Sequence, residues 1–371
     1  MKDDQAGNQT SNDSDNNYEG NTTNSTSVPN KDEQVQQLLR PLAQLLERSD
    51  VTELTINKPQ EVWIRTANTW IAQDIPELTE DYLHSLATSL IVFNGLQPKS
   101  IVSVTLPNGQ RGQIVMPPAC IEGTLSFSIR KHSMVVKTLE EFEAEGLLKD
   151  YTDVSFNKPT DKEAKALLNK PDFTRLEPFE VELLTLKREG KIGEFLKQCV
   201  LTKRNIIIAG KTGCGKTTFA RSLIKKVPTD ERLITIEDVH ELFLEDHHNK
   251  VHMLYGSSAG RVSANDCLES CMRQSPDRIF LSELRGDEAW EYLNSLNTGH
   301  PGSVTTTHAN SALQTFERVA TLVKKSEIGR KLTVEAIHQV LYSTVDVVLF
   351  LKQFRLTEVF YDPVFAKDNK G

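Results

Sequence analysis

The sequence predicts a mixed α/β protein in which a doubly wound parallel sheet follows a smaller α+β domain. The first observation is residues 210–217, Gly-Lys-Thr-Gly-Cys-Gly-Lys-Thr, which match the pattern G-x-x-x-x-G-K-[ST] of phosphate-binding loops. The second is the setting of this loop. An apolar run at 205–209 predicts a buried strand before it, and residues 219–226 have helical spacing after it. The third is that short apolar strands and helical patterns alternate through the rest of the chain.

Length, charge and cysteine content restrict the class of protein. The chain has 371 residues, room for two domains, and its net charge of −8 offers no overall basic field for nucleic acid. The five cysteines show no metal-ligand spacing, so we expect a reduced, cytoplasmic protein. We expect no signal peptide and no membrane span, so any association with a membrane would be peripheral.

The chain divides into four predicted segments. Residues 1–32 are rich in Asn, Asp, Ser and Thr and predict a disordered tail, because they contain little to bury. Residues 33–133 predict an α+β domain with two amphipathic helices and some six mostly antiparallel strands. Residues 134–176 are charged and irregular and predict a linker with one short helix near 162–168. Residues 177–371 predict the phosphate-loop domain, which opens on a helical lead-in.

Within the first domain the patterns alternate between the helical and the strand period. A helix from Glu33 is expected to kink at Pro41, and a second helix is expected from Thr79 to Phe93. The expected strands are 51–56, 61–65, 69–72, 102–106, 112–116 and 124–130, with turns at 57–59 and 67–68. Pro107-Asn108-Gly109 is a hairpin signal between the fourth strand and the fifth.

The phosphate loop predicts a nucleoside triphosphate site. Free N–H groups of the loop and the N-terminus of the following helix form an anion cradle. Lys216 is expected to reach the β- and γ-phosphates, and Thr217 to hold Mg²⁺. The predicted nucleotide-binding residues here are Gly210, Lys211, Thr212, Gly213, Cys214, Gly215, Lys216, Thr217 and Thr218.

Polar residues follow three of the strands expected in the second domain. These strands are 233–236, 251–254, 279–281, 302–307 and 345–351. Glu237, Glu283 and His308 stand just beyond the first, third and fourth, and ligands of such sheets bind at the carboxyl ends of strands. An acid there can deprotonate the attacking water or hold the water shell of Mg²⁺, and a histidine can sense the γ-phosphate. The combination favours a hydrolase over a passive nucleotide binder.

A second nucleotide motif in the chain carries little weight. Residues 169–172, Asn-Lys-Pro-Asp, match the N-K-x-D motif with which GTPases read guanine. That motif requires a buried strand before it, whereas residues 161–166 are helical in character, and the expected D-x-x-G is missing. Coincidence is the better interpretation.

Four motifs in this order resemble those of the secretion and pilus traffic ATPases. They are similar to a Walker A motif (210–217), an aspartate box (235–238), a Walker B motif (279–285) and a histidine box (298–310). The histidine box is most similar to that of the type IV secretion branch, the VirB-eleven family of the type II/IV secretion ATPase superfamily. The resemblance extends through 51–57 and 106–111 and covers roughly residues 35–360.

The resemblance implies site roles residue by residue. It implies a RecA-like ATPase domain after a PAS-like domain, with ATP and Mg²⁺ bound. Lys216, Glu237, Glu283 and His308 would be catalytic, with Glu283 favoured as the acid that activates water. Thr217 and, through water, Glu283 would hold Mg²⁺, because Ser282 stands where many phosphate-loop ATPases have Asp. Two arginines of the first domain, Arg111 and Arg130, would close over the nucleotide.

The resemblance also implies a function and partners. It implies a homo-hexamer that powers substrate export or pilus assembly at the cytoplasmic base of a bacterial type IV secretion system. Other secretion-channel ATPases and inner-membrane channel proteins would be its partners. The alternatives are a pilus or type II secretion motor, a RecA-like motor that binds nucleic acid directly, and a nucleotide-switched scaffold. Arg273 and Arg278 are candidates to act across a subunit boundary.

Overall fold

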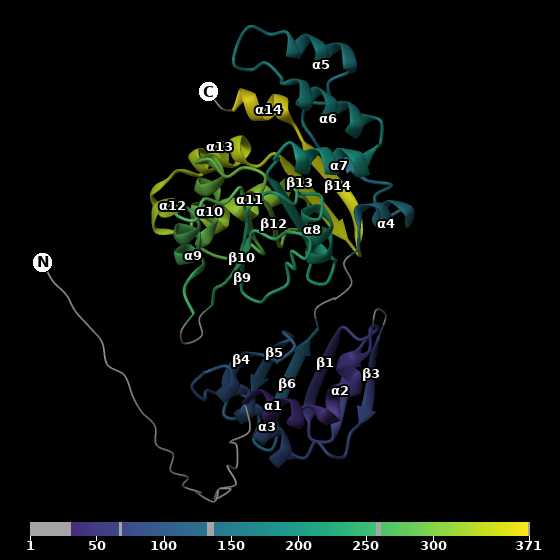
Figure 1. The fold of residues 1–371 in the computed structure, drawn as a ribbon, viewed down its shortest axis with the longest axis vertical. Helices are drawn as coiled ribbons and strands as arrows, with labels where there is room; N and C mark the ends of the chain where they lie inside the picture. The colour runs from purple at the N-terminus through teal and green to yellow at the C-terminus, as the bar shows by residue number, and fades with distance from the viewer. Residues whose placement is uncertain (1–30, 67–68, 132–136, 257–260, 370–371) are drawn as a thin grey trace, which may run out of the picture.

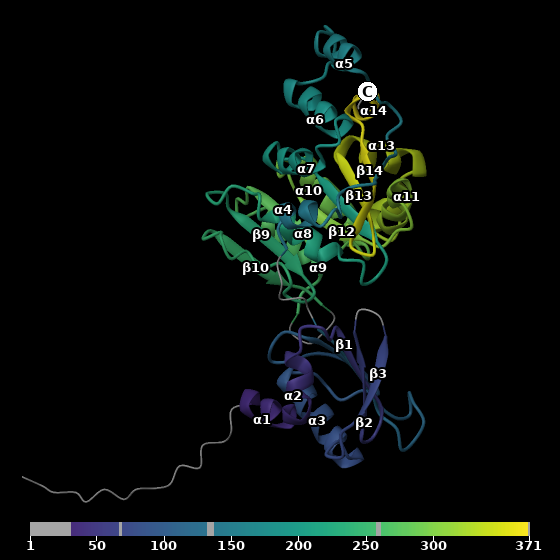
Figure 2. The same cartoon turned by 90° about the vertical axis from the view of Figure 1, so that its right-hand side faces the viewer.

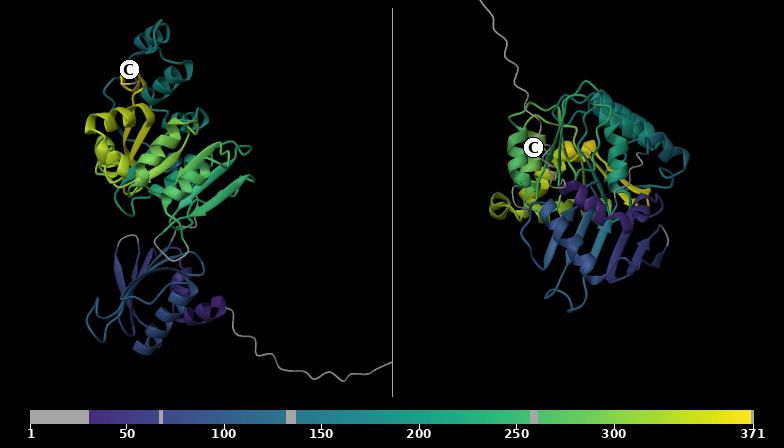
Figure 3. Two further views of the ribbon diagram at one scale, coloured as in Figure 1. Left: turned by 90° about the vertical axis from the view of Figure 1, so that its left-hand side faces the viewer. Right: turned by 60° about the horizontal axis from the view of Figure 1, so that its bottom comes forward.

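The computed structural model describes residues 31–66, 69–131, 137–256 and 261–369, which form two bodies stacked along the long axis (Figure 1). The left view of Figure 3 shows the first body, purple to blue, at the lower end of the molecule. The tail predicted over 1–32 lies outside the described residues, except Lys31 and Asp32, which open the first helix. The turn expected at 67–68 lies outside them too.

The first body is a six-stranded sheet with helices packed against it. Its strand order is β3-β2-β1-β6-β5-β4, and every neighbouring pair is antiparallel, as expected. The strands are β1 (Glu53–Lys58), β2 (Glu61–Arg65), β3 (Trp70–Asp74), β4 (Ile101–Thr105), β5 (Arg111–Val115) and β6 (Ser126–Arg130). The helices are α1 (Lys31–Leu38), α2 (Arg40–Glu47) and α3 (Glu80–Phe93). The single kinked helix is instead two helices, because Pro41 has no N–H to donate and sits in the first turn of α2.

The second body is built on parallel strands. Two sheets, ordered β10-β9-β11 and β12-β8-β13-β14-β7, adjoin where Leu284 N–H donates to the carbonyl of Thr306 at 2.8 Å. The strands are β7 (Thr152–Asp153), β8 (Ile206–Gly210), β9 (Leu233–Glu237), β10 (Lys250–Leu254), β11 (Arg278–Leu281), β12 (Val304–Thr307), β13 (Val347–Lys352) and β14 (Arg355–Tyr361). The expected parallel strands are all present, and β14, antiparallel to β13, is an addition.

Helices cover both faces of these sheets (Figure 2). The helices are α6 (Pro178–Arg188), α7 (Ile192–Leu201), α8 (Lys216–Ile224), α9 (Ala264–Cys271), α10 (Glu288–Asn297), α11 (Ala312–Val323), α12 (Glu327–Lys331), α13 (Val334–Thr344) and α14 (Pro363–Asp368). Side chains alternate along β8: Ile206 and Ile208 join a core cluster with α7 and α8, whereas Ile207 and Ala209 join another with α9, α10, α11 and α13. The chain is therefore a mixed α/β protein. Among the described residues, no helix combines the length and apolarity needed to cross a membrane.

From Leu139 onward, the segment predicted to be an irregular linker forms helices and packs against the second body. It contains α4 (Leu139–Ala144) and the expected short helix, α5 (Asp161–Leu168). Phe142 packs edge-on against Phe219 of α8, with ring centroids 5.0 Å apart. Buried Lys187 pairs with Asp153 at 2.9 Å and so joins β7 to α6. The sequence shows only a weak helical pattern in this segment, because the apolar residues that form these contacts are few and lie among charged residues.

Candidate active site

The phosphate loop joins β8 to α8 and is braced by the β13–β14 hairpin. Gly215 has φ +95° at the N-cap of α8, and a Cβ there would lie 2.5 Å from the ring of Phe354. The N–H of Phe354 donates to the carbonyl of Cys214 at 3.0 Å. A Cβ on Gly210 would lie 2.5 Å from the carbonyl oxygen of Leu351. The two glycines therefore permit a close approach between loop and hairpin as well as the turn itself.

Lys216 is buried and directed back onto its own loop. Its Nζ donates to the carbonyls of Gly210 at 3.0 Å and Lys211 at 3.2 Å, and lies 3.3 Å from Nδ1 of His308. Burial lowers the pKa of Lys216. Burial and the neighbouring Lys216 charge also lower the pKa of His308, so the imidazole is neutral at pH 7.

Glu283 lies between this histidine and an arginine. Its Oε2 accepts from Arg285 at 2.8 Å, and its Oε1 is 3.0 Å from Nε2 of His308 but is not aligned for a hydrogen bond. Burial opposes ionisation, but Arg285 outweighs it and lowers the pKa of Glu283, so the group is a carboxylate at neutral pH. A buried carboxylate oxygen that has no hydrogen-bond donor can accept a proton, or a hydrogen bond from a water molecule.

A chain of charges links this carboxylate to the first domain. Arg285 also contacts Asp238, whose Oδ1 accepts from Arg111 of β5 at 2.8 Å. Arg111 lies 3.0 Å from Glu241 as well, so it is held by two acids of the second body. Arg111 is paired across β5–β6 with Arg130, which is exposed and close enough to Lys216 to lower the pKa of that lysine.

Glu237, the other predicted acid, is completely buried and fully hydrogen-bonded. Its Oε2 accepts from the N–H groups of Glu241 and Leu242, both at 2.7 Å. Its Oε1 accepts from Thr235 at 2.7 Å and from His240 at 3.1 Å. Burial alone would raise the pKa of Glu237, but these hydrogen bonds outweigh it and lower the pKa to about 2. The geometry fits an anchor for the turn after β9 better than a base.

This difference between the two acids gives a testable prediction. We expect Glu237→Gln to lower the free energy of unfolding by about 3 kcal/mol at pH 7, because a drop from 4.5 to about 2 in pKa is worth that much. The contribution of the Glu237 carboxylate to the free energy of unfolding is complete above about pH 4.5 and is lost as the pH falls toward 2. Urea unfolding at pH 7 and pH 3 measures it. Equal stability of variant and wild type at pH 7 would contradict the anchor role.

The two arginines proposed to act across a subunit boundary differ sharply. Arg278 is completely buried, binds Glu231 through two nitrogens at 2.7 and 2.9 Å, and donates to the carbonyl of Val200 at 2.7 Å. These contacts leave it no access to a neighbouring subunit. Arg273 is exposed and pairs with Glu269 one turn away on the same helical stretch.

The structure adds residues to which the sequence assigned no role. Asp238 and Arg285 lie within the aspartate box and the Walker B motif, and opposite charges just beyond two adjacent strands could have indicated their pairing. Phe354, 140 positions beyond Cys214 by residue number, has no local signal for its contact with the loop. His240 and His252 flank Glu237 but are 12 residues apart, and only strand pairing brings them together.

Fold and site together define a phosphate-loop protein, and comparisons with known proteins agree. The family model "Type II/IV secretion system protein" matches residues 159–356. The type IV secretion system protein VirB11 of Brucella suis biovar 1 (strain 1330) is 41% identical over 340 residues, which cover 88% of this chain and 89% of that protein. The chain therefore belongs to the type II/IV secretion family, among the VirB11-like traffic ATPases, as the motifs predicted.

Solved structures show the same relationship. The crystal structure of the Brucella suis VirB11 ATPase in complex with sulphate is 39% identical, with a TM-score of 0.51, and covers 92% of this chain and 98% of that one. The pilus retraction motor PilT with bound ADP has a TM-score of 0.54 at 16% identity, covering 90% of this chain and 86% of its own. The likeness to PilT shows the fold alone.

Proposed function

We propose that this protein hydrolyses ATP at the carboxyl ends of β8, β11 and β12 and uses the energy for type IV secretion. The observation that carries the proposal is the meeting of Lys216, Glu283 and His308 beside a complete phosphate loop. Membership of an ATPase family supports ATP as the nucleotide. Hydrolysis requires a base for water and a cation for the transferred phosphoryl group, and these side chains supply both.

The chain's own residues suggest the order of events. Lys216 would leave the carbonyls of Gly210 and Lys211 for the β- and γ-phosphates, exchanging neutral acceptors for anionic ones. Glu283, through its unpaired Oε1, would take the proton of the attacking water. Neutral His308 would hydrogen-bond the γ-phosphate. Thr217 and, through water, Glu283 would hold Mg²⁺, which neutralises phosphate charge when bound.

The first domain is proposed as a lid on the nucleotide. Arg111 already ties it to Asp238, and exposed Arg130 is close enough to Lys216 for its charge to lower the pKa of that lysine. Cysteines introduced at Arg130 and Gly213 are expected to cross-link, within or between subunits, and more readily with nucleotide bound. Mass spectrometry of the disulfide-linked peptides measures the yield. The absence of a cross-link with and without nucleotide would contradict the lid.

The assembly and its place are further parts of the proposal. We infer a homo-hexamer of RecA-like domains, each preceded by a PAS-like domain within residues 33–133, at the cytoplasmic face of the inner membrane. The names of the relatives, components of type IV secretion systems, support channel proteins and other secretion ATPases as partners. Electron micrographs showing six-membered rings, together with ATP turnover that does not depend on DNA, are the expected results. Turnover only with DNA would favour the nucleic-acid motor instead.

A further inference from the structure

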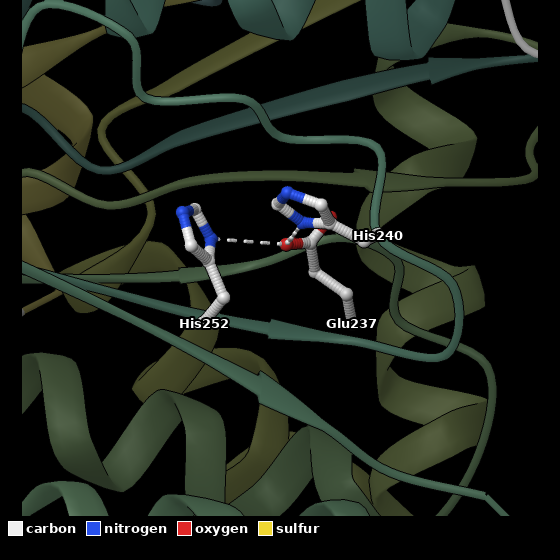
Figure 4. Close-up of side chains that lie close together, drawn as sticks. All are labelled: Glu237, His240 and His252. Carbon is white, nitrogen blue, oxygen red and sulfur yellow. Dashed lines mark hydrogen bonds and ion pairs between the residues drawn. The ribbon is translucent and has the colours of Figure 1, made fainter. Parts of the chain in front are cut away.

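A second cluster of ligating side chains lies at the end of β9 and includes a residue of the aspartate box. Glu237 ends β9, His240 follows it in the next turn, and His252 stands on β10 opposite Thr235. Figure 4 shows both imidazole rings turned toward one oxygen of the carboxylate. We propose that these three residues bind a divalent transition-metal ion of the zinc type. This site is separate from the Mg²⁺ of the proposed ATPase reaction.

The distances suit such an ion. Oε1 of Glu237 lies 3.1 Å from Nδ1 of His240 and 3.6 Å from Nδ1 of His252, and the ligand atoms are all within 4.8 Å of one another. Ligands at about 2.0–2.1 Å from a tetrahedral zinc ion are about 3.3 Å apart. Small movements of the two imidazole rings would therefore bring all three ligand atoms to bonding distance from one ion. His240 lies in the loop after β9 and not in a helix or strand.

The surroundings fix the ligands and leave an open position. The other carboxylate oxygen is held by two backbone N–H groups, and the Thr235 hydroxyl donates to Oε1 of Glu237 at 2.7 Å. Such outer contacts orient metal ligands and raise affinity. Nδ1 of His252, now 2.8 Å from that hydroxyl, would have to exchange this contact for the ion. The carboxylate is completely buried, but the side chains of His240 and His252 are 37% and 25% exposed, so an ion has a route from solvent.

The donor set selects the kind of ion. Two imidazoles and one carboxylate suit Zn²⁺ and its neighbours in the first transition row, whereas Mg²⁺ and Ca²⁺ prefer oxygen ligands throughout. Three protein ligands leave the fourth position of a tetrahedron to water. A bound ion would tie β9, β10 and the turn after β9 together, adjacent to Asp238 and its contact with Arg111.

The competing explanation is a hydrogen-bonded brace without metal. In that case the Nδ1 of His240 carries the proton and donates to Glu237, and His252 bonds Thr235. A metal instead needs both Nδ1 lone pairs free and the protons on the solvent-side nitrogens. The two explanations therefore differ in whether the folded protein takes up one ion per chain.

The test is a metal titration of the full-length, reduced protein without a histidine tag, stripped by chelator and free of nucleotide. We expect one Co²⁺ per chain, with the intense visible absorption of a tetrahedral site, displaced by Zn²⁺. His240→Ala and His252→Ala are each expected to weaken binding by about a hundredfold or more. Zn²⁺ should also raise the melting temperature of the wild type and not of these variants.

His338→Ala is the matched control, because His338 is likewise paired with one glutamate, Glu317 at 3.4 Å, but lies outside the cluster. It should bind Co²⁺ as the wild type does. If His252→Ala fails to fold, the more exposed His240→Ala carries the test. The absence of binding, or binding that is unchanged in the folded His240→Ala variant, would overturn the proposal and leave the brace. Neither result depends on ATP hydrolysis, so the proposed function is tested separately.

Discussion

Replacing Lys216 with alanine is expected to abolish ATP hydrolysis, with a loss of at least about 100–1,000-fold in kcat, or about 3–4 kcal/mol in the transition state. The Nζ of Lys216 is the buried cation of the loop, and it is already held by the loop carbonyls at 3.0 and 3.2 Å. Release of phosphate under saturating ATP and Mg²⁺ measures the effect.

The control for this variant is Lys225→Ala, an exposed lysine just beyond the end of α8. It removes the same charge close to the site but away from the loop and should leave turnover within about twofold, since isolated surface charges contribute little. Circular dichroism should show both variants folded. Near-normal turnover in folded Lys216→Ala would refute this loop as the active site.

Glu283→Gln is expected to bind ATP normally and to hydrolyse it about 100–10,000-fold more slowly. The amide keeps the size of the side chain and its contact with Arg285, but it cannot accept the proton of the attacking water. Nucleotide affinity, measured with a fluorescent ATP analogue, should change little. Single-turnover hydrolysis should show the defect in the chemical step.

Two comparisons make this prediction specific. Glu269→Gln, at an exposed acid paired with Arg273, should turn over ATP like the wild type. Glu237→Gln should lose stability rather than catalysis, because Glu237 is enclosed by its own turn. If Glu237→Gln instead is stable and inactive while Glu283→Gln stays active, the roles assigned to the two acids are reversed.

Much of the fold could be predicted because its signals are local. The strands of both bodies follow runs of apolar or alternating residues, and β8, the loop and α8 appear where the motif and its flanks required them. The stretch 139–176 could not be predicted in the same way. Phe142 contributes to the core only because α8 supplies Phe219 as its partner. A few apolar residues among charges do not reveal that they will be buried.

The sequence by itself determined the phosphate loop, the order of the four motifs and the family, because each depends on residues adjacent in the chain. The tertiary structure alone decided the roles of residues whose partners are distant. It left Glu283 with an unpaired oxygen beside His308 and enclosed Glu237 in hydrogen bonds. It bound Arg111 to Asp238, 127 positions away, and buried Arg278 against Glu231, 47 positions away. Whether a charge meets a ligand, an opposite charge or solvent depends on contacts that form only when the chain packs.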